Sequence, residues 1–406
     1  MRITPFHAWI RSLLVMAALI SWRGSLSATE PSWFQGNDNA IPPPLRTISV
    51  SSMEELTSAW SDAKPGDLIE VADGVYTSTE SVWLRANGTP EHPIVIRAKN
   101  RGKVVYSGPA RWRIDGAKWC VVEGFVFIHA DGGKGLEIKN SEYFRITRNH
   151  FRLAQVPDKS KTHWVYFTQK TNHMRVDHNL FEDKHILGNF IAFDGDKPGG
   201  GKEQVSQYNR IDHRVFNNYF EGLTGKTDET PLALSMGDTD TGPLDARFRP
   251  HRVIVAFNTF VDCGSPTLLV GYDDGGRLRM PSIDCVIANN LFVGAASPII
   301  KELHPQEDLT WEGNIIHVKA GGIAGISLKQ SEMRVVDPLL VMKDGVFRLS
   351  EKSPAISAAA GTYRFVLDDC DGQPRNAPLD VGADEFIQSG VKHRPLTVSD
   401  VGVTAP

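Results

Sequence analysis

The sequence predicts an all-β protein: a single right-handed parallel β-helix with a short capping helix at its N-terminal end. Two observations predict this fold. One short phrase recurs along the chain at intervals of 24 to 40 residues, and each recurrence consists of β-forming residues and turn residues rather than amphipathic helical runs. The chain of 406 residues, with 23% charged and 9% aromatic residues, has the composition of a globular protein.

The recurring phrase is Asn-x-Phe, preceded by a short run of Val, Ile or similar residues. It occurs in "RITRNHF", "RVDHNLF", "FNNYF", "VIVAFNTF", "CVIANNLF" and a decayed "LTWEGNII", with its Asn at positions 149, 179, 218, 258, 290 and 314. A period of this size indicates a solenoid. We expect each Phe to return to the interior. We expect each Asn to adopt left-handed backbone and to bond the Asn of the next coil.

Two histidines accompany the repeat. His178 and His213 each follow an Asp, and both stand close to the core phrase. The sequence favours packed or turn-bonded side chains for both histidines, with a place in a substrate groove as the alternative.

The two ends of a β-helix need covering, because an open end exposes unpaired strand edges. At the N-terminal end, "SSMEELTSAWSDA" predicts a helix from about Ser52 to Ala63, with Ser51 or Ser52 as its N-cap. At the C-terminal end, residues 353–386 are rich in turn formers and are expected to lie over the last coils. Residues 387–406 are predicted to form a tail.

The first 27 residues are predicted to be a secretory signal peptide. Basic residues precede the apolar stretch "SLLVMAALISW", which is too short to span a bilayer, and small residues follow it. An uncleaved anchor is the alternative. The domain assignment is therefore 1–27 signal peptide, 28–386 β-helix and 387–406 tail. The expected location is secreted or periplasmic, without membrane attachment after cleavage, and the expected state is a monomer.

The net charge and the cysteine content argue against several kinds of partner and site. A formal net charge of -4 without a basic run argues against nucleic acid. The four cysteines, at positions 120, 263, 285 and 370, are too few for a disulfide framework and lack zinc-ligand spacing. Cys263 and Cys285 occupy similar repeat positions, so either a bridge or two buried thiols is open. The Gly-rich "GDKPGGGKE" lacks the order of a phosphate loop and is interpreted as the wall of a groove.

Several segments together resemble a known family. They are "HWVYFTQKTNHMRVDHNLFEDK", "NRIDHRVFNNYFEGLTGKTDETPLALSMGD" and "RVIVAFNTFVDCGS", with weaker support from "KPGDLIEVADGVYT" and "DVGADEF". The resemblance is to polysaccharide lyase family 6, which contains alginate lyases and chondroitinase B. It covers most of residues 47–386. It implies a parallel β-helix that cleaves a uronate polymer by β-elimination. Alginate is the first expected substrate and a dermatan or chondroitin-type chain the next.

The resemblance also implies a Lys base, an Arg near the leaving oxygen and a Ca²⁺ held by an Asn and two carboxylates. This chain departs from that pattern. Lys226 stands where the calcium Asn is expected, although Glu229 is kept; Ser265, Thr267 and Tyr272 stand where two Glu and the Lys are expected. We therefore expect no calcium and no other cofactor.

Two residues are the resulting catalytic candidates, Tyr272 and Lys301, the latter close to the position of the family Arg. Tyr272, or Lys301 with a lowered pKa, would remove the proton. Lys226 would replace the metal charge. The substrate-binding candidates are Lys226, Glu229, Arg277 and Arg279.

Two other functions stay open. In one, the protein has kept the substrate groove of the fold and lost its catalytic activity, and it binds acidic glycans or has a structural role. A glycoside hydrolase would need facing carboxylates, for which Asp273, Asp274, Glu229 and Asp238 are the available residues.

Overall fold

The computed structural model describes most of the predicted β-helix region. The described residues are 30–35, 41–129, 133–153, 162–167, 171–182, 189–193, 212–222, 232–236, 252–264, 266–273, 279–280, 284–303, 306 and 309–387. The predicted signal peptide and nearly all of the predicted tail lie outside these residues, and the proposed domain limits there stay predictions. No helix in the described part is long and apolar enough to cross a membrane.

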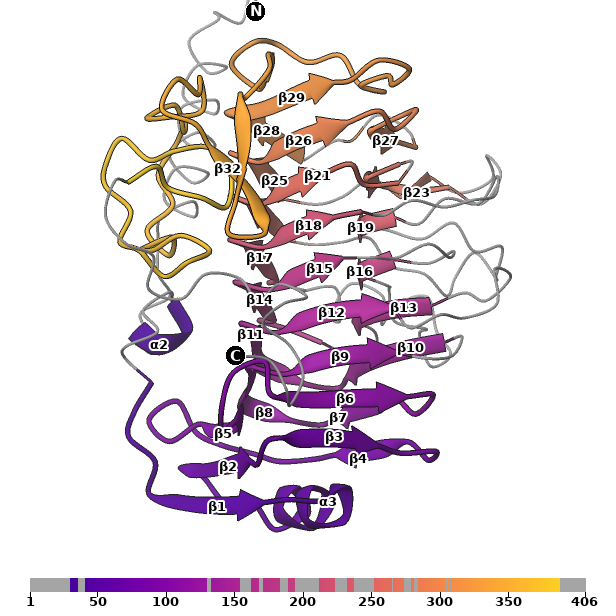
Figure 1. Ribbon diagram of the computed structural model, residues 1–406, viewed down its shortest axis with the longest axis vertical. Helices are drawn as coiled ribbons and strands as arrows, with labels where there is room; N and C mark the ends of the chain where they lie inside the picture. Colours follow the sequence, from indigo (N-terminus) through magenta and orange to yellow (C-terminus); the bar gives the residue numbers. More distant parts are fainter. Residues whose placement is uncertain are drawn as a thin grey trace, which may run out of the picture.

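The described strands confirm the parallel β-helix. The coils are built from three sheets, which we call A, B and C. Successive strands pass from sheet A to sheet B to sheet C and return to sheet A one coil higher, so each sheet pairs strands of neighbouring coils in parallel. In Figure 1 the strands of sheet B lie on the side that faces the viewer and point to the right, while the coils rise from β1 to β29. The chain therefore winds as a right-handed helix, as predicted.

Sheet A comprises β1 Arg46–Val50, β2 Asp67–Val71, β5 Ile94–Ala98, β8 Lys118–Glu123, β11 Glu142–Thr147, β14 Arg175–Asp177, β17 Arg214–Phe216, β20 Ile254–Ala256, β25 Cys285–Ala288 and β28 Leu309–Glu312. Sheet B comprises β3 Gly74–Thr77, β6 Val104–Gly108, β9 Val126–His129, β12 His150–Leu153, β15 Leu180–Glu182, β18 Tyr219–Glu221, β21 Thr259–Val261, β26 Leu291–Gly294, β29 Asn314–Val318 and β30 Met333–Val335. Sheet C comprises β4 Val82–Leu84, β7 Trp112–Asp115, β10 Gly133–Lys139, β13 Thr162–Phe167, β16 Asn189–Phe193, β19 Leu232–Met236, β22 Leu268–Val270 and β27 Ile300–Glu302.

Two antiparallel ribbons accompany the three sheets. They are β23 Tyr272–Asp273 with β24 Arg279–Met280, and β31 Leu340–Lys343 with β32 Val346–Leu349.

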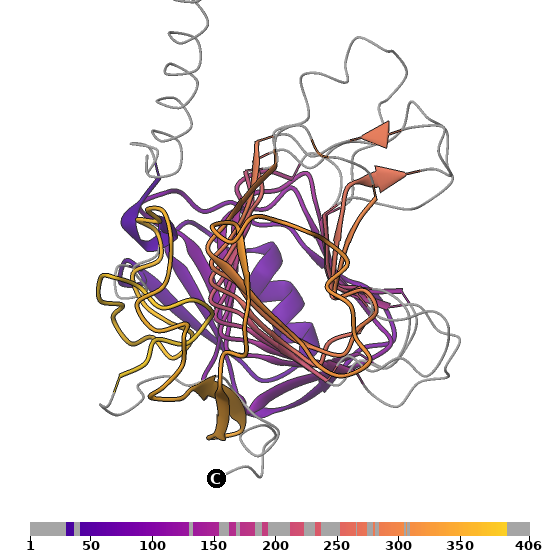
Figure 2. The ribbon, with the colours of Figure 1, turned by 90° about the horizontal axis from the view of Figure 1, so that it is seen from above.

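Helix α3, Met53–Ser61, is the predicted capping helix. Its N-cap Ser52 accepts from the backbone N–H of Glu55, and the Glu55 carboxylate accepts in return from the N–H of Ser51. This reciprocal pairing satisfies two N–H groups that a helix start otherwise leaves open. Leu56 and Trp60 are buried, and Figure 2 shows the helix lying across the end of the coils. The short helix α2, Ser32–Gln35, was not predicted.

The asparagine ladder and the phenylalanine stack are both confirmed. From Asn149 to Asn290, each ladder Asn donates its side-chain amide to the Asn of the following coil, at 3.0 to 3.1 Å, and Asn314 is the last acceptor. Inside the coils, the rings from Phe127 to Phe292 stack at 4.5 to 5.0 Å between centroids. Repetition of the phrase is therefore structural.

The predicted left-handed backbone lies one residue earlier than expected. Positive φ is found at Arg148, His178, Asn217, Phe257 and Asn289, each directly before its ladder Asn. The ladder Asn must point inward to bond both neighbours, so the bend of the chain falls on the residue before it. The expectation that the ladder Asn itself is left-handed is wrong.

The two Asp-His pairs are not equivalent in the coils. Register pairs Arg175 with Arg214 and Asp177 with Phe216, so His178 corresponds to Asn217. His213 instead lies one residue before β17, at the position that Met174 holds before β14. The similarity of "VDH" and "IDH" is therefore not a shared position in the coil.

The segment from Tyr363 to Phe386 runs along the flank of sheet A rather than only over the last coils. It contacts widely separated coils: Asn217 donates to Asp368 O, Ala383 N donates to Thr259 Oγ1, and Tyr363 donates to Glu312. Figure 1 shows this segment in yellow beside the upper coils. All four cysteines are buried and none of them forms a disulfide, so Cys263 and Cys285 are two buried thiols rather than a bridge.

Candidate functional site

The outward positions of sheet C form a column that runs the length of the coils. Register joins the residues Trp83, Arg113, Glu137, Tyr166, Ala192, Ser235, Leu269 and Lys301 in order. Their strand neighbours, such as Leu268 and Val270, belong to the apolar core. The alternate positions of these strands therefore lie on the side away from the core; Ala192 and Leu269 in this column are covered, at 4% exposure each, whereas Trp83 and Lys301 at its two ends are exposed.

Lys301, one of the two catalytic candidates, lies at the C-terminal end of this column. Its side chain is exposed, and its Cα is in register with Leu269 of the preceding coil. An outward cation on a sheet flank is available to a ligand. Lys301 does not point into the apolar interior.

Tyr272, the other candidate, begins β23, which follows β22 after Gly271. β23 pairs with β24 so that Tyr272 is opposite Met280 and Asp273 is opposite Arg279. Figure 2 shows this ribbon projecting away from the coils. The structure thus brings the backbones of Tyr272 and Arg279 together on one ribbon, and that ribbon continues from the strand beside Lys301.

The remaining candidates are not all within the described part of the chain. Lys226, Glu229, Arg277 and Ser265 lie outside the described residues, and so do Asp238 and Asp274. Thr267 is buried, and its hydroxyl donates to Gly264 O at 3.1 Å. The hydroxyl proton of Thr267 is therefore already used in a hydrogen bond within its own turn.

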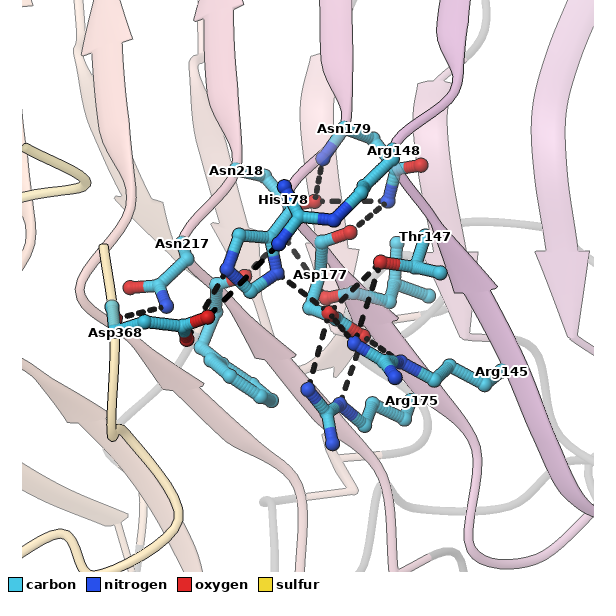
Figure 3. A network of polar contacts seen from close by, with 12 residues as sticks. Arg145, Thr147, Arg148, Arg175, Asp177, His178, Asn179, Asn217, Asn218 and Asp368 are labelled. Carbon is cyan, nitrogen blue, oxygen red and sulfur yellow. Dashed lines mark hydrogen bonds and ion pairs between the residues drawn. The ribbon is translucent and has the colours of Figure 1, made fainter. Parts of the chain in front are cut away.

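A buried ion network lies on the opposite side of the molecule, outside sheet A (Figure 3). Asp177 accepts paired hydrogen bonds from Arg145, at 3.0 and 2.7 Å, and from Arg175, at 2.8 and 3.1 Å. Thr147 donates to the same carboxylate at 3.0 Å. Arg175 also donates to the carbonyls of Trp33 and Phe34 at the C-terminal end of α2. The network therefore fastens the N-terminal segment to the coils.

His178 extends this network toward the C-terminal segment. Its Nδ1 lies 2.6 Å from Asp177 Oδ2, and its Nε2 lies 3.2 Å from Asp368 Oδ1. The side chain is fully buried, so the packed and turn-bonded role is confirmed for His178. Through His178 the network joins three parts of the chain that are far apart in sequence: the segment of α2, the coils with Asp177, and the C-terminal segment with Asp368.

The charges of the network shift two pKa values. Burial alone would raise the pKa of Asp177, but Arg145 and Arg175, together with hydrogen bonds, hold it well below its usual value. Burial alone would lower the pKa of His178, yet Asp368 and Asp177 outweigh it and raise that pKa. These shifts favour the charged forms, as a structural ion network requires.

His213 is packed in the core. Its ring lies near Phe167 and Phe193, at 5.1 and 5.0 Å between centroids, and its Nδ1 accepts from Met174 N–H. Burial lowers its pKa well below the ordinary value, and His173 lowers it further. His213 is therefore a neutral core residue away from solvent.

Among the described residues, one group of possible metal ligands lies within mutual reach: Cys370, Asp371 and Asp384. Arg348 donates to both aspartates, so its guanidinium already supplies the positive charge there. Burial, together with the neighbouring Asp371, raises the pKa of Asp384 to about 6. The group holds the C-terminal segment to β32.

Neither of these two buried arginine networks was predicted from the sequence. For the network around Asp177, the signal was present in "FRIT" and "RVDH", where a charged residue stands in a buried strand at the spacing of outward positions. Such charges are buried only when they are paired, so Arg145, Arg175 and Asp177 could have been grouped from the repeat alignment.

The described strands define a parallel β-helix protein whose sheet C runs from β4 to β27 along the coils. Within that class the chain resembles the chondroitinase B-like lyases of polysaccharide lyase family 6, as the sequence predicts. Residues 50–217 match the family model described as Chondroitinase B, which is less than half of the chain.

Solved structures of lyases are also similar. The PL6 family alginate lyase AlyGC has 14% identity and a TM-score of 0.32, and the match covers 89% of this chain and 59% of that chain. This chain thus spans about three fifths of AlyGC. An alginate lyase from Paenibacillus sp. str. FPU-7 has 14% identity and a TM-score of 0.42, with 71% and 99% coverage. Pectate lyase Bsp165PelA from Bacillus sp. N165, in complex with trigalacturonate, has 12% identity and a TM-score of 0.45, with 70% and 86% coverage. No curated protein matches.

Proposed function

We propose that the protein is a secreted polysaccharide lyase that cleaves a uronate polymer by β-elimination without calcium. Alginate is the first substrate to test, and a dermatan or chondroitin-type chain is the second. One observation supports this most: the exposed Lys301 is in register with Leu269, on the strand that leads through Gly271 into Tyr272. Lys301 therefore lies on sheet C, next to the strand β22 whose chain continues into the ribbon that begins at Tyr272.

The chemistry sets what this site must do. A base takes the proton from C5 of the uronate, the C4–O4 bond breaks with its electrons moving to O4, and a C4–C5 double bond forms. The departing O4 takes a proton. Tyr272 or Lys301 is proposed as the base, because a phenolate beside cations and a neutral amine are both competent bases.

Negative charge builds on the carboxylate as the proton leaves, so the site needs fixed positive charge. Lys226 is proposed to supply it in place of a metal. Arg277 and Arg279 are proposed to bind uronate carboxylates through their planar guanidinium groups. Glu229 is proposed to contact sugar hydroxyls.

The residues at the family's calcium positions do not fit a calcium ion. An ammonium group and two hydroxyl groups stand there, whereas Ca²⁺ prefers several carboxylate and carbonyl oxygens. Thr267 is one of them, and its buried hydroxyl already bonds Gly264 O. No step of the proposed reaction uses a metal.

Incubation with alginate, dermatan sulfate and a pectic polymer tests the proposal. Elimination leaves an unsaturated sugar at the new non-reducing end, which absorbs in the ultraviolet. We expect that absorbance to rise with at least one polymer, in step with new reducing ends. New reducing ends without absorbance would indicate hydrolysis, and binding without either signal would indicate an inert glycan-binding scaffold; both results contradict the proposal.

A further inference from the structure

A second feature of the sheet C flank lies at its N-terminal end, on coils far from the candidate catalytic residues. Trp83 is 41% exposed on β4, although tryptophan ordinarily avoids such exposure. Of the described residues, three cations lie over its ring: the guanidinium of Arg113 is 4.9 Å from the ring centroid, that of Arg85 is 5.6 Å away and Lys139 Nζ is 5.7 Å away. We call Trp83, Arg85, Arg111, Arg113 and Lys139 the basic platform.

Two carboxylates pair with the platform without neutralising it. Glu137 lies 3.4 Å from Arg111 and 3.7 Å from Arg113, and Asp115 lies 3.3 Å from Lys139 and 3.6 Å from Arg85. Among the residues that the structure describes, four cations thus pair with two carboxylates. Since the chain as a whole carries a net charge of -4, this local surplus is not a consequence of its composition.

Exposure decides which charge a ligand meets. The two carboxylates are shielded, at 13% exposure for Glu137 and 15% for Asp115. The cations project further, up to 68% exposure for Arg85. The carboxylates therefore lie beneath and hold the guanidinium groups in place, while the surface that faces solvent is aromatic and positive.

We infer that the basic platform is a binding subsite for an anionic polysaccharide, remote from the bond that is cut. The exposed indole ring offers an apolar face for a sugar ring, and the surrounding cations match the carboxylates of a uronate chain. Trp83 and Lys301 stand at opposite ends of one register column. At the usual strand spacing, the seven steps between β4 and β27 amount to roughly 34 Å.

The inference rests on the proposed function for its polymer class, but the binding itself needs no catalysis. A polymer that lies along the coil axis would contact both ends of the flank, so the platform would raise the affinity for long chains by raising the local concentration of the reacting segment. A short oligosaccharide could not reach both ends. Comparing long polymers with short oligosaccharides therefore distinguishes binding at the platform from binding at the catalytic site.

Two substitutions test the platform, Trp83→Ala and Arg85→Gln, and both side chains are exposed enough to be changed without unpacking the core. Arg364→Gln, at an exposed arginine on the C-terminal segment, is the matched control. Titration calorimetry would use long-chain alginate as the probe and an uncharged cellulose ether as the neutral chain. We expect Kd for alginate to rise roughly tenfold in Trp83→Ala and about fivefold in Arg85→Gln. The control should bind as the wild type does, and the neutral chain should bind weakly.

Kinetics provide a second readout. We expect KM for long alginate to rise in both variants, with kcat unchanged and with KM for a trisaccharide unchanged. Variants that bind long alginate as tightly as the wild type, or neutral chains that bind equally well, would overturn the inference. If no polymer is cut but alginate binding depends on Trp83 and Arg85, the proposed function fails and the subsite stands.

Discussion

Asn218 receives the side-chain amide of Asn179 at 3.0 Å and donates its own amide to Asn258 at 3.0 Å, so it is one interior step of a ladder. It also donates to the carbonyls of Val176 and Phe216. All of these groups are buried, where an unsatisfied polar group costs about 1 to 3 kcal/mol.

Asn218→Ala should therefore lower the free energy of unfolding by roughly 3 kcal/mol or more, because it leaves several buried groups without partners. Urea unfolding followed by circular dichroism measures the change. Asn100→Ala is the matched control, since Asn100 is exposed and its side chain donates to Asp73 at the surface; this variant should change stability by less than about 0.5 kcal/mol. Equal effects of the two variants would show that the ladder is not stabilising.

Asp177→Asn should destabilise the protein by about 3 to 5 kcal/mol, because it leaves the buried guanidinium groups of Arg145 and Arg175 without their anion. Asp73→Asn, at an exposed carboxylate, is the control. Limited proteolysis adds a local readout: release of α2 should expose the bonds near Trp33, whose carbonyl Arg175 holds. A variant as stable as the wild type would contradict the structural role of the network.

Acid should weaken the same network. The pKa of Asp177 is depressed in the folded state, so its contribution is complete above the ordinary value of 3.8 and is lost as the pH falls below it. We expect the wild type to lose stability below about pH 4 more steeply than Asp177→Asn does. Unfolding midpoints across the acidic range measure this, and parallel curves would count against the assignment.

His178 should give the opposite dependence. Its folded pKa is raised above 6.5, so its contribution is complete below that value and is lost as the pH rises through the folded pKa. His178→Asn removes the charge while keeping a residue that tolerates the left-handed backbone, as Asn217 and Asn289 do in other coils. The wild type should exceed this variant in stability by more at about pH 6 than at about pH 8. A difference that does not vary with pH would contradict the charged state.

Lys301→Ala and Tyr272→Phe test the proposed catalytic pair. Loss of the group that moves the proton should reduce kcat about 100-fold or more, whereas loss of a group that only binds should mainly raise KM. Lys343→Ala, at an exposed lysine on the β31–β32 ribbon, should leave both constants unchanged. Full activity in both Lys301→Ala and Tyr272→Phe would exclude the assignment.

The repeat made the fold predictable because each coil must satisfy the same constraint. Residues such as Asn179 and Phe181 recur at the same places in successive coils. This regular recurrence specifies both the asparagine ladder and the phenylalanine stack. The left-handed residue was misplaced by one position, because the sequence does not reveal whether Asn149 or Arg148 absorbs the bend. The pairing of His178 with Asp368 joins residues 190 positions apart, and no local pattern encodes such a contact.

The site was less predictable for a related reason. Lys226 and Arg277 lie between repeat phrases, where the interval exceeds one plain coil, so the ladder does not constrain their positions. Lys301 could be placed because it falls within a strand of the repeat, at the alternate position that faces outward. The basic platform around Trp83 was missed because it precedes the first recognisable Asn-x-Phe phrase.

The most direct test of the central claim is the initial rate of unsaturated-product formation from the preferred uronate polymer, measured in EDTA and again after calcium is restored. We expect a steady rise in ultraviolet absorbance in EDTA, at the same rate with calcium present. No rise with any uronate polymer, or a rise only when calcium is returned, would contradict elimination without calcium.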